Sequence, residues 1–206
     1  MAQGESLLIA ASAVPTWDLT ADAVVIGVGM AGACAAIEAR NAGASVIAIE
    51  RSGGCTGTTS AASGHFYLGG GTAVQKACGF EDDPEDMARY LAAVSVRPDE
   101  TKIQLYAHGS VAHFEWLEEH GIPFDRSFYP EKSVVQPGRE CLIWTGNEQV
   151  WPYRDMAKPA PRGHVIQHMG WGGGRPLVDV LEASARAKGV EVVVDARAVA
   201  LIRDGD

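Results

Sequence analysis

The sequence predicts an α/β fold with a parallel β-sheet, and three stretches of the chain carry this prediction. A strand, a glycine-rich turn, a helix and a second strand follow one another between residues 22 and 50. Two helices are expected between residues 83 and 121, and a further helix and strand between residues 175 and 194. Strands that alternate with helices in this way form parallel sheets.

The first stretch supplies the elements in order. The run Ala23–Ile26 is short, largely β-branched and followed by glycine, which suits a strand buried on both faces. Residues 33–42 are mostly small or apolar and predict a helix that is closed by Gly43. Residues 45–49 predict the second strand, which ends at an acidic residue, Glu50.

The turn at residues 27–32, Gly-Val-Gly-Met-Ala-Gly, is typical of dinucleotide binding. Gly27 permits a tight turn, Gly29 lets the backbone approach a pyrophosphate, and Gly32 lets the helix pack close to the strand. Unpaired amides at the helix start favour phosphates. Glu50, roughly 20 residues further on, can accept the ribose hydroxyls of an adenosine. We expect an ADP-containing dinucleotide; the alternative is a glycine-rich turn without a ligand.

The loop at residues 51–64 offers backbone amides and small hydroxyl groups and almost no bulk. Such a loop can wrap a second face of the pyrophosphate and reach toward an isoalloxazine ring. A flexible linker has a similar composition. Because the loop comes directly after Glu50, we favour a loop that covers the ligand, and this also argues against a nicotinamide dinucleotide.

At this point the sequence resembles a family. Residues 22–50 and the loop GTTSAASG at 57–64 resemble the flavoprotein dehydrogenases that include fumarate reductase, the succinate dehydrogenase flavoprotein and the 3-ketosteroid dehydrogenases. The stretches HFYLGGGT at 65–72 and KPAPRGH at 158–164 are most similar to the ketosteroid dehydrogenase branch, particularly its 4-ene-forming enzymes. The resemblance covers nearly all of residues 18–206. It implies a Rossmann-like FAD-binding domain of the glutathione-reductase type, truncated before its cap domain.

The motifs and the resemblance together imply a set of FAD-binding residues. In succinate dehydrogenases a histidine of the second loop carries FAD covalently. Thr58 stands at that place here, so we expect non-covalent FAD. By position in the family the backbone around Ala198 faces the adenine, with Arg197 and Val199 as alternatives. The expected cofactor-binding residues are Gly27, Gly29, Met30, Ala31, Gly32, Glu50, Arg51, Gly57, Thr58, Thr59, Ser60, Ser63, Gly64, His65 and Ala198.

Composition and charge exclude several classes of partner. The net charge is −9 and no two Lys or Arg residues are adjacent, which argues against nucleic acid and acidic membrane surfaces. The four cysteines have no CxxC spacing and are expected to be reduced thiols of a cytoplasmic protein. The histidines do not cluster with them, so no metal site is expected. The apolar patch at residues 7–14 is too short for a transmembrane segment.

We expect an amino-terminal arm at residues 1–20 and a FAD-binding domain at residues 21–206. Within this domain residues 122–170 read as irregular loops. Six aromatic residues lie there, and we leave open whether they face an apolar substrate or cover the core. They are Phe124, Phe128, Tyr129, Trp144, Trp151 and Tyr153.

The resemblance implies a FAD-dependent oxidoreductase that acts on CH–CH bonds, with a small apolar, steroid-like substrate and an electron acceptor. A hydride passes to the flavin, and the α-proton passes to a protein base outside this chain. Alternatives are a fumarate reductase-like flavoprotein, or a flavin-binding fragment with no catalysis of its own. A second strand is expected at residues 199–202, entering a hairpin at 203–206. The chain is therefore expected to be an amino-terminal piece, and no catalytic residue is assigned.

Overall fold

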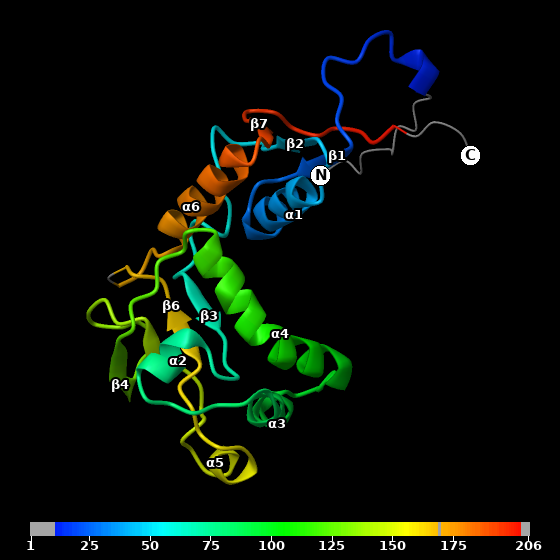
Figure 1. Ribbon diagram of the computed structural model, residues 1–206. Coiled ribbons are helices and arrows are strands. Elements are labelled where there is room, and N and C mark those ends of the chain that lie inside the picture. The colour runs from blue at the N-terminus through cyan, green and yellow to red at the C-terminus, as the bar shows by residue number, and fades with distance from the viewer. Residues whose placement is uncertain (1–10, 169, 203–206) are drawn as a thin grey trace, which may run out of the picture. The chain divides into compact units, whose positions relative to one another are not determined.

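The computed structural model of the chain describes residues 11–168 and 170–202 (Figure 1). These residues form two compact units. The first unit contains residues up to 59 and from 181 onward, and the second contains residues 60–180. Residues 1–10 of the expected arm and residues 203–206 of the expected hairpin lie outside the described residues.

The first unit contains the predicted parallel sheet. Its strands have the order β1-β2-β7, and both pairs are parallel. Val24 lies opposite Ile47, and Ile26 opposite Ile49. The elements of this unit are the 3-10 helix η1 (Ala11–Ala13), β1 (Ala23–Ile26), α1 (Met30–Asn41), β2 (Val46–Ile49) and β7 (Glu191–Val193). The prediction of an α/β fold with a parallel sheet is confirmed.

Helix α1 packs on β1 and β2 through its small residues. Ala33, Ala36 and Ile37 are buried, and the helix ends at the cap residue Ala42 before Gly43, whose φ is +90°. This is the expected glycine stop. The helix begins three residues earlier than the apolar pattern predicted, because the end of the glycine turn forms its first turn.

Strand β1 differs from the expectation of burial on both faces. Val24 and Ile26 are 55% and 56% exposed, whereas the alternate positions are partly buried. In the described chain β1 is an edge strand of its sheet. Alternate side chains of a strand point to opposite faces of the sheet, so the face that carries Val24 and Ile26 is the exposed one.

The second unit contains a sheet that the sequence analysis missed. Its order is β3-β6-β5-β4, antiparallel except for the parallel pair β4/β5. The strands are β3 (His65–Tyr67), β4 (Phe128–Lys132), β5 (Leu142–Trp144) and β6 (Gly163–Val165). The expectation of irregular structure over residues 122–170 is therefore wrong in part. Strands of three to five residues are too short for an alternating pattern to reveal them.

The helices Pro84–Val94 and Glu100–Glu119 begin where the sequence predicted, whereas the short helices Ala73–Ala77 and Tyr153–Met156 were not predicted. Asp83 and Asp99 accept the amides of Asp86 and Lys102 at 2.7 and 3.1 Å and so cap α3 and α4. Met87 of α3 packs with Ala107 of α4 in one core cluster. The helices are α2 (Ala73–Ala77), α3 (Pro84–Val94), α4 (Glu100–Glu119), α5 (Tyr153–Met156) and α6 (Gly174–Ala187), which continues into the first unit.

One further expectation differs from the structure. Residues 199–202 form no strand in the described chain, because a strand needs a neighbour to complete its hydrogen bonds. Of the six aromatic residues named above, Phe124 and Trp144 are buried, and Trp144 makes edge contacts with Phe80 and Phe128. Trp151, by contrast, is 69% exposed. No helix within residues 11–168 and 170–202 is long and apolar enough to cross a membrane.

Candidate functional site

A cavity of about 240 Å³ lies in the first unit, at the carboxyl ends of β1 and β2. Parallel sheets of α/β proteins bind their ligands at this edge. Three segments meet there: the end of β1 with the glycine turn, the end of β2, and the chain after β7. The lining residues are Ile26, Gly27, Ile49, Glu50, Arg51, Ala196, Arg197 and Ala198.

The glycine turn has the geometry that its sequence predicts. Gly27 has a φ of +90°, a conformation that side chains disfavour. A Cβ at Gly32 would overlap the carbonyl oxygen of Gly27 and lie 3.2 Å from Cγ1 of Val25. Close packing of α1 on the turn therefore requires glycine at position 32.

The start of α1 presents amide groups without side-chain bulk. Gly29 is the N-cap residue and makes no side-chain hydrogen bond. The amide of Met30 donates to Oγ1 of Thr59 at 3.1 Å, whereas helix geometry leaves the amides of Ala31 and Gly32 without intrahelical acceptors. The Thr59 contact ties the second glycine-rich loop to the helix start, which favours the interpretation of a loop that covers a ligand.

Glu50 connects the end of β2 to the glycine turn. Its Oε2 accepts the amide of Val28 at 3.0 Å, and its Oε1 accepts both the hydroxyl and the amide of Ser52, at 2.7 and 2.9 Å. These hydrogen bonds, those of Ser52 first, lower the pKa of Glu50 to about 2. The carboxylate is therefore ionised at neutral pH and can accept hydroxyl groups of a ligand.

The chain after β7 completes the cavity. The amide of Ala196 donates to the carbonyl of Glu50 at 3.0 Å, and the amide of Asp195 donates to that of Ser52 at 3.0 Å. Of the three positions that we weighed for the adenine contact, Ala198 and Arg197 line the cavity, whereas Val199 is not among its lining residues. Ala196 and the Ser52 side chain were not predicted, and no motif pointed to them.

The remaining predicted residues lie in the second unit or at its border. Gly57 and Thr58 precede Thr59 in the first unit, and Ser60 opens the second unit. The backbone near Ser63 and Gly64 packs against Gly173: a Cβ at Gly64 would lie 2.8 Å from the carbonyl carbon of Gly173. The amide of Gly174 donates to the carbonyl of Ala62 at 2.8 Å. Two glycine-rich stretches that are far apart in sequence thus meet, which the sequence did not reveal.

His65 begins β3 and pairs with Val165. Its Nε2 is buried without a hydrogen-bond partner among the described residues, as is Oε1 of Gln136. Burial lowers the pKa of His65, so this side chain is neutral at neutral pH. Its expected contact with the cofactor stays a prediction.

A buried polar network lies in the second unit. Arg162 donates from Nε and Nη2 to the two oxygens of Asp82, at 3.0 and 2.6 Å, and both side chains are fully buried. His164 is buried nearby, with Nδ1 at 3.1 Å from the carbonyl oxygen of Arg162 and Nε2 at 2.8 Å from Oγ1 of Thr72. Because a carbonyl only accepts, Nδ1 carries the proton and Nε2 accepts from the Thr72 hydroxyl. Burial lowers the pKa of His164 to about 4.

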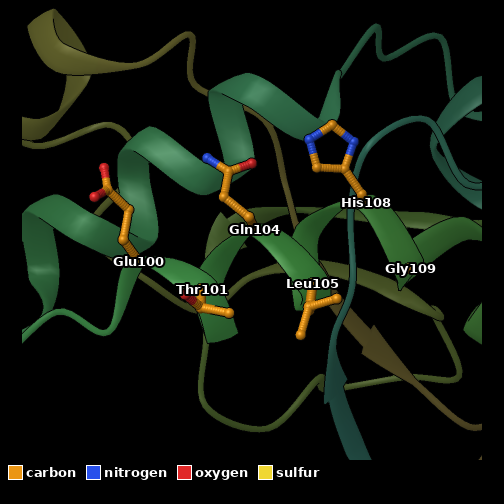
Figure 2. A pocket seen from close by; sticks show the side chains of 6 residues that line it. All are labelled: Glu100, Thr101, Gln104, Leu105, His108 and Gly109. Atoms are coloured by element: carbon orange, nitrogen blue, oxygen red, sulfur yellow. The ribbon is translucent and has the colours of Figure 1, made fainter.

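Figure 2 shows a second hollow, of about 760 Å³, along one side of α4. Its lining side chains come from successive turns of this single helix, among them Leu105 and His108. Nε2 of His108 lies 3.0 Å from Oε1 of Glu85. This hollow lacks the convergent polar groups from several segments that mark the cavity at Glu50. Within the described chain no three His, Cys, Asp or Glu residues could hold a metal ion.

The cavity at Glu50 fits the adenosine end of a dinucleotide. Gly29 leaves room for a pyrophosphate at the start of α1, where free amide groups favour phosphate. The ionised carboxylate of Glu50 can accept ribose hydroxyls. A family model described as FAD binding domain matches residues 22–206. The chain belongs to this family of FAD-binding domains. FAD is accordingly its cofactor, and the expectation of FAD is confirmed.

Known relatives of this FAD-binding domain include two steroid dehydrogenases. The chain is 33% identical over 208 residues to a 3-oxo-5-alpha-steroid 4-dehydrogenase of Comamonas testosteroni, covering 98% of this chain and 38% of the relative. It is 44% identical, with a TM-score of 0.88, to the crystal structure of 3-ketosteroid-Δ4-(5α)-dehydrogenase from Rhodococcus jostii RHA1 in complex with 4-androstene-3,17-dione. That match covers 96% of this chain and 42% of the other chain.

A third relative shares the fold. The open conformation of a flavocytochrome c3 fumarate reductase is 23% identical with a TM-score of 0.58, over 84% of this chain and 26% of the other. The expected resemblance to the fumarate reductase and ketosteroid dehydrogenase flavoproteins is confirmed, and the ketosteroid branch is the closer of these matches. The chain spans about two fifths of the length of the steroid dehydrogenases that it matches.

Proposed function

We propose that this FAD-binding domain serves a FAD-dependent oxidoreductase that introduces a carbon–carbon double bond into a 3-ketosteroid. The observation that carries the proposal is the similarity to the Rhodococcus Δ4-dehydrogenase, which extends over 96% of the chain at 44% identity. The Comamonas relative supports the same class of substrate. An electron acceptor completes the reaction.

Residues of the first unit would hold the cofactor. Glu50 would receive the ribose hydroxyls, and the glycine turn with the start of α1 would receive the pyrophosphate. The backbone around Ala198 and the side chain of Arg51 would border the adenine, since both line the cavity. The expected contacts of Gly57, Thr58 and Ser60 belong to the same proposal.

The cofactor would be bound without a covalent link. The succinate dehydrogenase histidine has its counterpart in Thr58, whose hydroxyl is a poor candidate for a flavin link. When bound, FAD supplies the two-electron step by taking a hydride from the substrate. The protein's part is to bind, orient and shield, and no residue of this chain is assigned to proton transfer. We also propose a cytoplasmic location, because all four cysteines are free thiols.

Fumarate reduction has less support. The fumarate reductase match is 23% identical, which supports a shared fold and not a shared substrate. A flavin-binding module without catalysis predicts a bound flavin and no turnover of any ketosteroid.

The decisive experiment combines a spectrum and an activity assay on the full-length protein. The purified protein should show a flavin absorption spectrum, and acid denaturation should release the flavin into the supernatant. With an artificial electron acceptor it should oxidise saturated 3-ketosteroids, and with an artificial electron donor it should not reduce fumarate. A flavin that stays with the precipitate would contradict non-covalent binding. A flavoprotein inactive on ketosteroids would contradict the proposed substrate class while leaving the FAD site intact.

A further inference from the structure

We propose that Ser52 is a positioning residue of the nucleotide site, whose side chain holds the Glu50 carboxylate in the orientation that receives a ribose. The inference rests on the proposed contact of Glu50 with FAD. Neither the motif nor the resemblance pointed to position 52.

The contacts of Ser52 converge on one carboxylate oxygen. Its hydroxyl lies 2.7 Å and its amide 2.9 Å from Oε1 of Glu50. The same hydroxyl lies 2.9 Å from the carbonyl oxygen of Gly54, and because it has a single proton we assign that proton to the shorter contact, with the charged Oε1. Oε2 of Glu50 accepts the amide of Val28 at 3.0 Å. The carboxylate is thus held at both ends, by the loop after β2 on one side and by the glycine turn on the other.

A count of acceptor positions shows what this arrangement leaves for a ligand. A carboxylate offers about four acceptor positions. Ser52 supplies two donors to Oε1 and Val28 supplies one to Oε2. One position therefore remains, on Oε2, beside the glycine turn. Loss of the Ser52 hydroxyl would free a position on Oε1 and leave the carboxylate held by the two amide groups alone, and so less firmly in this orientation.

The same contacts govern the charge of Glu50. The Ser52 side chain is the largest cause of the low pKa of Glu50, followed by the Ser52 amide and the Val28 amide. The other charged groups at the cavity are Arg51 and Arg197. An ionised carboxylate accepts a hydroxyl more strongly than a neutral acid does. Ser52 thus acts on both the direction and the charge of the acceptor.

The backbone at position 52 is held independently of the hydroxyl. The amide of Asp195 donates to the carbonyl of Ser52, and the amide of Ala196 donates to that of Glu50, both at 3.0 Å. These two bonds remain when the side chain changes. The hydroxyl can therefore be removed without releasing the loop.

The matched variants Ser52→Thr and Ser52→Val differ in the hydroxyl at nearly constant shape. FAD binding to the full-length apoprotein is measured by calorimetric titration, with circular dichroism as the check of folding. Ser52→Thr should bind like the wild type, whereas Ser52→Val should bind roughly tenfold more weakly. On acidification the affinity of Ser52→Val should begin to fall at a higher pH than that of the wild type, because its Glu50 is protonated earlier.

A double-mutant cycle separates positioning from general support of the loop. In a Glu50→Ala background, Ser52→Val should cause little further loss of affinity. Equal losses in both backgrounds, or identical affinities and pH profiles for Ser52→Val and Ser52→Thr, would overturn the inference. Should Ser52→Val not fold, Ser52→Ala takes its place with the same expectation. A wild-type apoprotein that binds no FAD would overturn the proposed function, and the inference with it.

Discussion

The two units use polar groups in opposite ways. In the first unit the key acid, Glu50, lines an open cavity, is held by three donors and keeps one acceptor position. In the second unit the charges of Arg162 and Asp82 are fully buried and paired with each other. The first arrangement suits reversible binding, whereas in the second each buried charge depends on its partner, so that removal of one of them is costly.

The buried network of the second unit also gives a structural reason for part of the family resemblance. Two stretches, HFYLGGGT and KPAPRGH, carried the resemblance to the ketosteroid branch. In the structure they pair with each other: β3 lies beside β6, and Thr72 contacts His164. We infer that these two stretches resemble the ketosteroid branch because both help to form the core of the second unit. Substitution of their charged residues should therefore change the stability of the protein and not substrate binding.

Breaking the buried ion pair should have the largest effect. Arg162→Met leaves the Asp82 carboxylate buried without its partner, which should lower the free energy of unfolding by about 3–5 kcal/mol. Denaturant unfolding of the apoprotein measures this. The double variant Arg162→Met/Asp82→Leu should recover much of the loss, because it removes the stranded charge. A single variant as stable as the wild type would contradict the structural role.

The pH dependence of stability should reveal His164. The unfolded histidine has a pKa near 6.5 and the folded one about 4, so between these values the unfolded chain binds the extra proton. The free energy of unfolding should therefore fall as the pH drops through this window, by up to about 3 kcal/mol. Denaturation at a series of pH values measures the slope. In the variant His164→Gln the free energy of unfolding should depend less on pH over this window. An unchanged pH dependence would show that His164 does not cause it.

Gly32 lies so close to the backbone of Gly27 that it leaves no room for a side chain, unlike Gly54 in the following loop. Gly32→Ala places a Cβ against the Gly27 carbonyl, which should cost about 1–3 kcal/mol of stability and strongly weaken FAD binding. Gly54→Ala is the matched control, because a Cβ there meets nothing within 4 Å. Thermal unfolding and FAD titration of both variants test this. Equal behaviour of the two would refute the packing argument.

Removal of the Glu50 side chain should change the stability of the fold least among these variants, while it clearly weakens FAD binding. Glu50→Ala should weaken FAD binding by about 1–3 kcal/mol, the range for a hydrogen bond to a charged group. Its effect on unfolding of the apoprotein should be much smaller than that of Arg162→Met. Calorimetric titration with FAD measures the loss of affinity, and denaturant unfolding of the same variant measures the change in stability. An unchanged dissociation constant would exclude Glu50 from the site.

Local sequence determined the parts of this protein that depend on neighbouring residues. The strand, glycine turn, helix and strand of residues 23–49, the two helices between residues 83 and 121, and the position of Glu50 at a strand end all follow from short patterns. These features form within a few residues of one another, so backbone conformation and local hydrogen bonding suffice to predict them.

Tertiary structure alone decided the contacts between distant segments. The pairing of β3 with β6, the Arg162–Asp82 pair and the approach of Gly64 to Gly173 join residues 80 or more positions apart. Ser52 was missed for a related reason: its role depends on the rotamer of Glu50 and on the Val28 amide beyond it. A one-dimensional pattern records which residues are present, whereas the direction of a side chain is set by the atoms that folding brings around it.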